Sequence, residues 1–232
     1  MGVIIDKNAD EAILNELEGR GAFICRSFEM KSLPQPVNTH PDMQIHFASR
    51  TLAFAAPSAF EHYRTLLPDS VRLICGAADP GSTYPYDCAY NIARVGNRII
   101  GNFKYTDSEL LNYYSNLNYT FIDVKQGYTK CNLCTVDDSS AITEDEGIFR
   151  KLTAAGVDVL KLPAGEIELC GFDHGFIGGA SGFLSENTLA FFGDFSKNSY
   201  YEKLKKFVLS KKVDIIFLSS TKPADYGSLL YF

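Results

Sequence analysis

The chain has 232 residues, of which 46% are hydrophobic and 22% are charged, and its formal net charge is −6. These fractions are typical of a globular protein and exclude a disordered, collagen-like or coiled-coil chain. The acidic balance disfavours a nucleic-acid partner, because phosphate binding needs a basic surface.

The sequence carries no targeting signal that we can identify. The segment MGVIIDKNAD has no basic region followed by a long apolar stretch, so we expect no secretory signal. No run approaches the roughly 18 apolar residues that span a membrane. The six cysteines are therefore expected to be reduced thiols, and the protein is expected to be cytoplasmic, without a membrane partner.

An internal repeat organises the chain. Each unit is expected to contain a turn, a strand, a second short strand, a helix and a third strand. The first complete unit has expected strands at 40–47, 51–56 and 71–76, with a helix that begins at Ser58 and has Glu61 as capping-box partner. The next three units have expected strands at 84–92, 97–102 and 120–126; at 128–136, 140–143 and 157–162; and at 175–184, 188–193 and 213–220. Their helices are expected to begin at Asp107 and to span 144–156 and 198–212.

The repeat predicts a ring. Successive intervals of 45, 45, 46 and 47 residues separate Asp42, Asp87, Asn132, Gly178 and Asp225. A period of this length is typical of a propeller. The fifth unit is split, because 225–232 supplies its first strand and the other end of the chain supplies a strand at 2–6, a helix at 9–17 and a strand at 21–28. Pairing of the two ends would close the ring and leave no open sheet edge. The alternative is an ordinary α/β domain without a ring.

With this order of elements the sequence resembles the pentein fold, the five-bladed α/β propeller of the guanidino-group-modifying enzymes. That superfamily includes arginine deiminases, agmatine deiminases and dimethylarginine hydrolases, and also a non-catalytic translation factor. The segments that carry the resemblance are HPDMQIHFASRTLAFAA (40–56), QGYTKC (126–131), HGFIGGASG (174–182) and DYGS (225–228). The last three are similar to an uncharacterised bacterial branch. The resemblance implies an α/β fold with pseudo-fivefold symmetry in a single domain, 1–232, with blades at 40–83, 84–127, 128–174, 175–224 and 225–232 plus 1–39.

The sequence departs from the enzymes at the reacting groups that the resemblance implies. The deiminating members carry a nucleophilic Cys in the last strand and a His in the fourth unit. Here the last cysteine is Cys170, and Gly227 or Ser228 stands where the nucleophile would be. Gly178 and Gly179 replace the His. We therefore do not expect ordinary deiminase chemistry.

A polar pocket is expected at the ring axis, where the first strands converge. Converging carboxylates repel one another unless a cation, a ligand or a proton relieves them. We expect Asp42 and Asp87 to face one another and to bind a small guanidino or amino-acid-like ligand. The expected ligand-binding residues are His40, Asp42, Asp87, Asn91, Lys130, Asn132, Ser181 and Asp225. Alternatively, the aspartates only cap turns.

Cys131, beside Lys130, is the candidate reactive thiol, and with His174 it would serve a hydrolase or transferase of non-standard arrangement. A zinc site built from Cys131, Cys134, Cys170 and His174 is disfavoured, because residues three apart on a strand point to opposite faces. We expect no metal and no cofactor. The competing hypothesis is a non-catalytic interaction protein that uses the ring as a scaffold.

Overall fold

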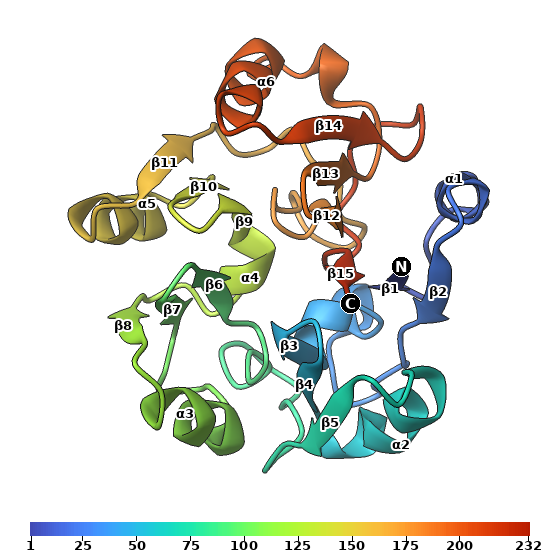
Figure 1. Cartoon of the computed structure of the whole chain (residues 1–232), viewed down its shortest axis with the longest axis vertical. Coiled ribbons are helices and arrows are strands. Elements are labelled where there is room, and N and C mark those ends of the chain that lie inside the picture. Colours follow the sequence, from blue (N-terminus) through green and yellow to red (C-terminus); the bar gives the residue numbers. More distant parts are fainter.

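Five small sheets with helices outside them make up the molecule. The computed structural model describes residues 1–232 and contains six α-helices and fifteen strands, in five separate three-stranded sheets. In every sheet the middle strand runs antiparallel to one neighbour and parallel to the other. Figure 1 shows the five sheets around a common centre, with the helices at the periphery. The fold is therefore mixed α/β, as expected.

Four units follow the chain in order. The first contains β3 (Ile45–Ser49), β4 (Leu52–Ala55), α2 (Pro57–Leu66) and β5 (Arg72–Cys75). The second contains β6 (Ala93–Val95), β7 (Arg98–Gly101), α3 (Ser108–Ser115) and β8 (Thr120–Asp123). The third contains β9 (Leu133–Asp137), β10 (Ser140–Thr143), α5 (Glu146–Ala154) and β11 (Asp158–Lys161). The fourth contains β12 (Ser181–Ser185), β13 (Thr188–Phe191), α6 (Tyr201–Ser210) and β14 (Asp214–Phe217).

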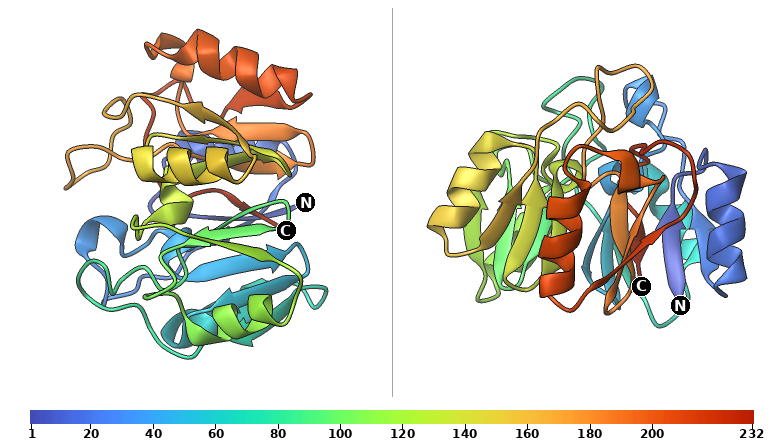
Figure 2. Two further views of the ribbon diagram at one scale, coloured as in Figure 1. Left: turned by 90° about the vertical axis from the view of Figure 1, so that its left-hand side faces the viewer. Right: turned by 90° about the horizontal axis from the view of Figure 1, so that it is seen from above.

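The fifth unit joins the two ends of the chain. β15 (Leu230–Tyr231) pairs antiparallel with β1 (Gly2–Ile5), which pairs parallel with β2 (Phe23–Arg26) beside α1 (Glu11–Gly19). Figure 2 shows the two ends close together. The expected pairing of the terminal segments is confirmed.

Hydrogen bonds connect every unit to both of its neighbours. They join Gly227 O to Asp42 N (3.2 Å), Ala48 O to Arg94 Nη1 (2.9 Å), Arg94 O to Thr135 Oγ1 (2.9 Å), Cys131 O to Gly179 N (2.8 Å) and Ser181 O to Leu229 N (3.1 Å). All five contacts involve a first strand or the residues just before it. These contacts therefore lie toward the centre of Figure 1, and the residues before the first strands are brought together there.

The helix starts follow local sequence chemistry. α3 begins where expected, and the Asp107 side chain caps it by accepting from the backbone N–H groups of Glu109 and Leu110. α2 begins one residue earlier than predicted, at Pro57, because proline is already shaped for the first helical position. Ser58 is therefore not the cap of α2, and its Oγ instead donates to Asp79 Oδ1 at 2.9 Å.

All five expected first strands begin later than predicted, at Ile45, Ala93, Leu133, Ser181 and Leu230, and two of them show why. Residues 84–92 are irregular, and β6 begins only at Ala93. A short helix, α4 (Thr129–Asn132), precedes β9. The Asn91 side chain explains this local structure, because its Oδ1 accepts from the backbone N–H groups of Lys130 (2.8 Å) and Cys131 (3.2 Å). A side chain before one strand thus shapes the turn before the next.

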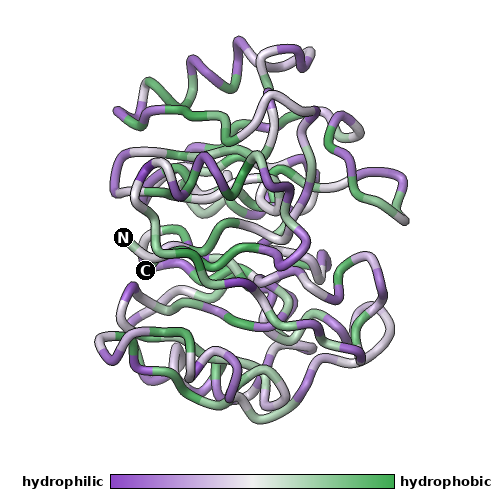
Figure 3. Tube along the Cα trace, turned by 90° about the vertical axis from the view of Figure 1, so that its right-hand side faces the viewer, coloured by the Kyte–Doolittle hydropathy of each residue, from purple (hydrophilic) through white to green (hydrophobic).

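Four clusters of buried hydrophobic side chains lie between the sheets and the helices. The largest includes Phe54, Tyr63 and Tyr90, all almost fully buried. The hydrophobic parts of the trace run through the middle of the molecule in Figure 3. No helix has both the length and the apolar character needed to cross a membrane.

Candidate functional site

The strand pairing defines which residues of the five units are equivalent. In three units the last residue of the middle strand pairs with a residue of the first strand, namely Ile45, Leu133 or Ser181. In the other two units the observed pairing stops one residue earlier, and continuing it by one residue places Ile92 and Leu229 opposite the end of the middle strand. The residues just before these are therefore equivalent, and they are Gln44, Asn91, Asn132, Ala180 and Ser228.

This register corrects the one counted from the sequence. Asp42 precedes its reference residue by three positions, whereas Asp87 precedes Ile92 by five, so the two aspartates are not equivalent. Asp87 instead accepts from Tyr128 Oη at 2.6 Å, and Cys88 Sγ lies 3.2 Å from its other oxygen. The count from the sequence failed because irregular segments of different length precede the strands.

Asp42 lies at the centre of a buried polar cluster. Ser228 Oγ is 2.7 Å from Asp42 Oδ2 and 2.9 Å from Gly178 O, so its single proton can go to either. Lys130 Nζ donates to the same Oγ at 2.9 Å. Cys131 Sγ also lies 3.1 Å from Asp42 Oδ2. The structure thus brings Asp42, Lys130 and Cys131 together, and adds Ser228.

Cys131 is held as a thiol. Asn91 Nδ2 donates to its Sγ at 3.1 Å, and the sulfur donates to Asp42. Burial raises the pKa of the Cys131 thiol well above its usual value, and the charges of Asp42 and Asp225 raise that pKa further. A thiolate is the reactive form of cysteine. The site therefore disfavours Cys131 as a nucleophile.

The His40 ring lies between two carboxylates. Its Nδ1 is 3.8 Å from Asp225 Oδ1, and its Nε2 is 4.0 Å from Asp6 Oδ2. All three side chains are at least 95% buried. Burial raises the pKa of Asp6 and of Asp225, against the opposing effect of His40. His40 Nδ1 has no hydrogen-bond partner.

Asp225 and the two glycines close one side of the cluster. The Asp225 carboxylate accepts from Phe176 N and Gly227 N, both at 2.9 Å. A Cβ on Gly179 would come within 2.0 Å of that carboxylate, and one on Gly178 within 2.3 Å of Lys130 O. Glycine is required here for close approach of the backbone.

Three other expected residues have separate environments. Asn132 is buried, and its Nδ2 has no hydrogen-bond partner. Ser181 Oγ donates to Ile177 O at 2.7 Å. His174 is half-buried against Phe176, and Cys131 makes its side-chain hydrogen bonds with other residues. The Cys131–His174 pairing therefore has no hydrogen bond to support it.

Cys131, Cys134, Cys170 and His174, the zinc grouping that the sequence disfavoured, do not form a cluster. Cys134 is buried, whereas Cys170 is exposed. The only cluster of potential metal ligands in the chain contains Cys131 with His40 and Asp42 instead. Strand alternation is not the reason, because Cys131 is in α4 and only Cys134 is in a strand.

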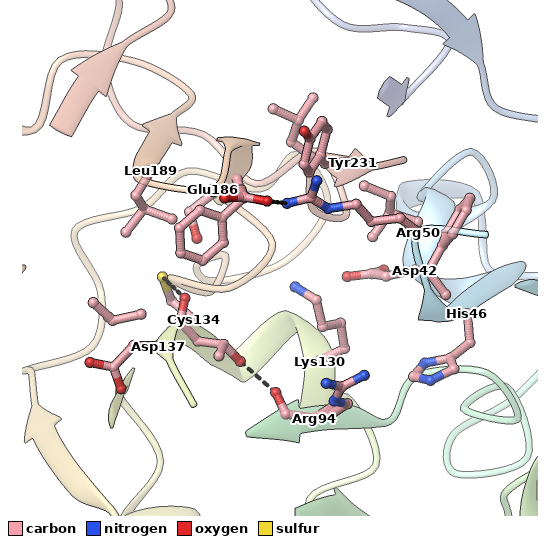
Figure 4. A pocket seen from close by; sticks show the side chains of 18 of the residues that line it. Asp42, His46, Arg50, Arg94, Lys130, Cys134, Asp137, Glu186, Leu189 and Tyr231 are labelled. Atoms are coloured by element: carbon pink, nitrogen blue, oxygen red, sulfur yellow. Dashed lines mark hydrogen bonds and ion pairs between the residues drawn. The ribbon is translucent and has the colours of Figure 1, made fainter. Parts of the chain in front are cut away.

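A cavity of about 460 Å³ lies along the first strands. Figure 4 shows Lys130 pointing into its middle, with Asp42 to one side and the Arg50–Glu186 ion pair across from it. That ion pair spans 3.1 Å, and the Arg50 guanidinium lies 4.6 Å from the centre of the Tyr231 ring. Ligand sites commonly occupy 300–1,000 Å³. The cavity is therefore large enough for a small metabolite.

Arg94 and Ser228 are among the residues that the sequence reasoning missed, as are Asp6, Asp137 and Asp138. Arg94 lines the cavity, and Ser228 was considered only as the residue replacing a nucleophile. Arg94 lies two residues after Ile92, and alternate residues of a strand share a face. Counting every second residue along the first strand from Ile92 would therefore have identified Arg94 as a residue that faces the cavity.

The fold and the polar centre define a pentein-fold protein that lacks a cysteine in the last segment. Solved structures confirm this class. Inosamine-phosphate amidinotransferase from Streptomyces griseus is 11% identical, with a TM-score of 0.60 over 99% of this chain and 92% of that chain. DDAH from Pseudomonas aeruginosa, in complex with citrulline, is 10% identical, with a TM-score of 0.58 over 94% and 92%. SxtG, an amidinotransferase of saxitoxin biosynthesis from Microseira wollei, is 14% identical, with a TM-score of 0.56 over 93% and 87%.

The chain belongs to the Family of unknown function (DUF6873), whose model matches residues 4–230. No curated protein matches the sequence. The identities to the solved structures are low, so the likeness shows the fold and leaves the ligand to be inferred from the residues.

Proposed function

We propose that the protein binds a small amino-acid-like molecule in the central cavity, with arginine and related guanidino compounds as the first candidates. The observation that carries this proposal is that Lys130 and Arg94 both line the cavity and neither forms an ion pair with a carboxylate. Two partly buried cations without an anionic partner favour a ligand that brings a carboxylate.

The two cations are fixed for this role. Arg94 uses Nε on Gly96 O (3.0 Å) and Nη1 on Ala48 O (2.9 Å), which leaves its Nη2 for a ligand. Lys130 has three N–H donors and uses one on Ser228. Charge-assisted hydrogen bonds to a carboxylate are roughly twice as strong as neutral ones. We therefore assign the carboxylate of the ligand to Lys130 and Arg94.

The amino or guanidino end of the ligand fits the opposite end of the cavity. Asp137, the last residue of β9, and Asp138 line the cavity there. Lys130 precedes β9, and at about 3.3 Å per residue the strand from Leu133 to Asp137 then spans roughly 13 Å. That length accommodates an extended molecule of the size of arginine. The expected pair of Asp42 and Asp87 is replaced in this proposal, because Asp87 already bonds Tyr128.

Binding, and not thiol-dependent deimination, is the activity we propose. The elevated pKa of Cys131 argues against a resting thiolate. The last segment of the chain offers Ser228, which has a φ of 72° and bonds Lys130 and Asp42. A serine hydroxyl is a weak nucleophile unless a base activates it.

We also propose that the chain is a single domain, 1–232, that forms a closed five-bladed propeller in a cytoplasmic protein. The hydrogen bonds between all neighbouring units support the closure. The six cysteines are free, which supports a reducing compartment. The proposed blades are 40–83, 84–127, 128–174, 175–224, and 225–232 with 1–39.

Thermal shift and calorimetry with arginine, agmatine, citrulline and methylated arginines test the ligand proposal. A ligand that binds only the native state raises its melting temperature. Arginine should bind more tightly than agmatine, which has the guanidinium but no carboxylate. Lys130→Met should weaken arginine binding by about tenfold or more, because a hydrogen bond to a charged group contributes about 1.5–3 kcal/mol.

The control is Lys222→Met, which removes an exposed lysine paired with Glu168 on the surface. This variant should bind arginine as the wild type does. Equal affinity for arginine and agmatine, together with unchanged binding in Lys130→Met, would contradict the carboxylate assignment.

A further inference from the structure

His40, Asp42 and Cys131 form a compact group of potential metal ligands. Each offers one donor atom, and these atoms lie within 4.8 Å of one another. The three residues are at most 4% exposed. Among their donor atoms, His40 Nδ1 and Asp42 Oδ1 are buried and make no hydrogen bond. Buried polar atoms are nearly always satisfied, so two orphans in one cluster point to a missing partner.

We propose that His40, Asp42 and Cys131 bind a divalent transition-metal ion of the Zn²⁺ class. Imidazole nitrogen, carboxylate oxygen and thiolate sulfur are the donors that zinc takes in proteins. The proposal does not depend on the amino-acid-like ligand proposed above, since of the three residues only Asp42 lines the cavity.

The surroundings of His40 resemble the outer shell of a metal site. A metal-bound histidine usually directs its other ring nitrogen at a carboxylate, which fixes the tautomer. Asp6 Oδ2 lies 4.0 Å from His40 Nε2. Asp6 itself accepts from Thr39 Oγ1 (2.8 Å) and Asn8 N (2.7 Å), so its position is fixed. A proton on Nε2 facing Asp6 leaves the Nδ1 lone pair for the metal.

The local charge also favours a cation. The cluster contains the buried carboxylate of Asp42, and the buried carboxylates of Asp6 and Asp225 flank His40. The nearby basic side chains are His40 itself and Lys130, which reaches Asp42 only through Ser228. Buried charges are stable when they are paired or coordinate a metal. A divalent ion between Asp42 and His40 would balance this excess of carboxylates.

Binding the ion requires one proton to leave. The S–H bond of Cys131 breaks, the proton goes to solvent and the sulfur electron pair forms the bond to the metal, with no change of oxidation state. Asn91 Nδ2 already donates to this sulfur at 3.1 Å and can keep that bond to the thiolate. Three protein ligands leave a fourth tetrahedral position for water or for a molecule in the cavity.

This site differs from the zinc grouping with Cys131 and Cys134 that the sequence disfavoured. Cys134 is three residues from Cys131 but lies outside the cluster. The ligands from His40 and Asp42 come from another unit of the fold and are distant in sequence. The chain therefore offers a matched control, because Cys134 is a buried free thiol as Cys131 is.

Titration of the full-length, chelator-treated protein with Co²⁺ tests the site, because cobalt bound to a thiolate gives a charge-transfer absorption band. The wild type and Cys134→Ser should each bind one ion with this band. Cys131→Ser should lose the band and bind at least tenfold more weakly. Asp6→Asn should weaken binding 10- to 100-fold, which is the usual effect of an outer-shell change. No band in the wild type, or an equal band in Cys131→Ser, would overturn the proposal.

A second measurement uses the wild type alone, in case Cys131→Ser does not fold. In enough denaturant for Cys131 of the metal-free protein to react with a thiol reagent, Zn²⁺ should protect Cys131 and leave the exposed Cys75 and Cys170 reactive. Equal labelling of Cys131 with and without Zn²⁺ would refute the site.

Discussion

Glu144 should make the stability of the protein fall as the pH rises toward 8. This residue directly follows β10, and its Oε2 accepts from Ile177 N at 2.9 Å, whereas Oε1 is buried without a partner. Burial raises the pKa of Glu144 to about 8, and the negative charge of Asp225 adds to the rise. The loop that carries Gly178 is thus held by a carboxyl group that is protonated at neutral pH.

The size and sign of the effect follow from proton linkage. An ordinary glutamate titrates near 4.5, so between about pH 4.5 and 8 the folded chain holds a proton that the unfolded chain has lost. The stability contribution of this group is complete below pH 4.5 and is lost as the pH rises through 8. The free energy of unfolding should fall by up to about 1.4 kcal/mol per pH unit in that window.

Glu144→Gln removes the titration and keeps the acceptor for Ile177. Urea unfolding at pH 5, 6, 7 and 8 should give a flatter stability profile for Glu144→Gln than for the wild type, with the variant more stable at pH 8. Glu202→Gln, which changes an exposed residue on α6, is the control and should keep the wild-type slope. Parallel profiles for Glu144→Gln and the wild type would refute the reasoning.

Three further outcomes are expected. Iodoacetamide at neutral pH should modify the exposed Cys75 well before Cys131, because burial raises the pKa of Cys131. Mass spectrometry of the labelled native protein measures this order, and faster labelling of Cys131 would restore it as a candidate nucleophile. Gly179→Ala should destabilise by about 1–3 kcal/mol through overpacking, whereas Gly19→Ala, with open space around it in α1, should stabilise by up to about 1 kcal/mol in the same urea titration. Deletion of 226–232 removes β15 from the fifth sheet and should lower the melting temperature strongly; a truncated chain that melts like the full one would contradict the topology.

The order of elements could be predicted because each unit repeats the same local signals. Short apolar strands alternate with amphipathic helices, and capping residues such as Asp107 mark where a helix begins. The split fifth unit followed from the same logic, since the residues around Leu230 lack a partner unless they pair with Val3 and Ile4. Local sequence signals and the pairing of strand edges thus determine the order and pairing of the helices and strands.

The contents of the centre could not be predicted, because they depend on register and on contacts between units. The segment 84–92 contains apolar and aromatic residues that suggest a strand, but the chain there is irregular, with Tyr90 Oη bonded to Ala78 O at 2.8 Å. Such contacts shift where β6 begins, and a shift of one residue turns every side chain to the other face.

The five equivalent positions show that the symmetry belongs to the backbone and not to the chemistry. Gln44 bonds within its own neighbourhood, where Oε1 accepts from Phe28 N and Tyr63 Oη. Asn91 bonds across to the backbone of the third unit and to Cys131. Ser228 links Lys130 to Asp42. Because Gln44, Asn91 and Ser228 bond different partners, the centre can hold both a cavity with Lys130 and Arg94 on its wall and a separate cluster of metal-ligand type. The function of the centre must therefore be read from its contacts, residue by residue.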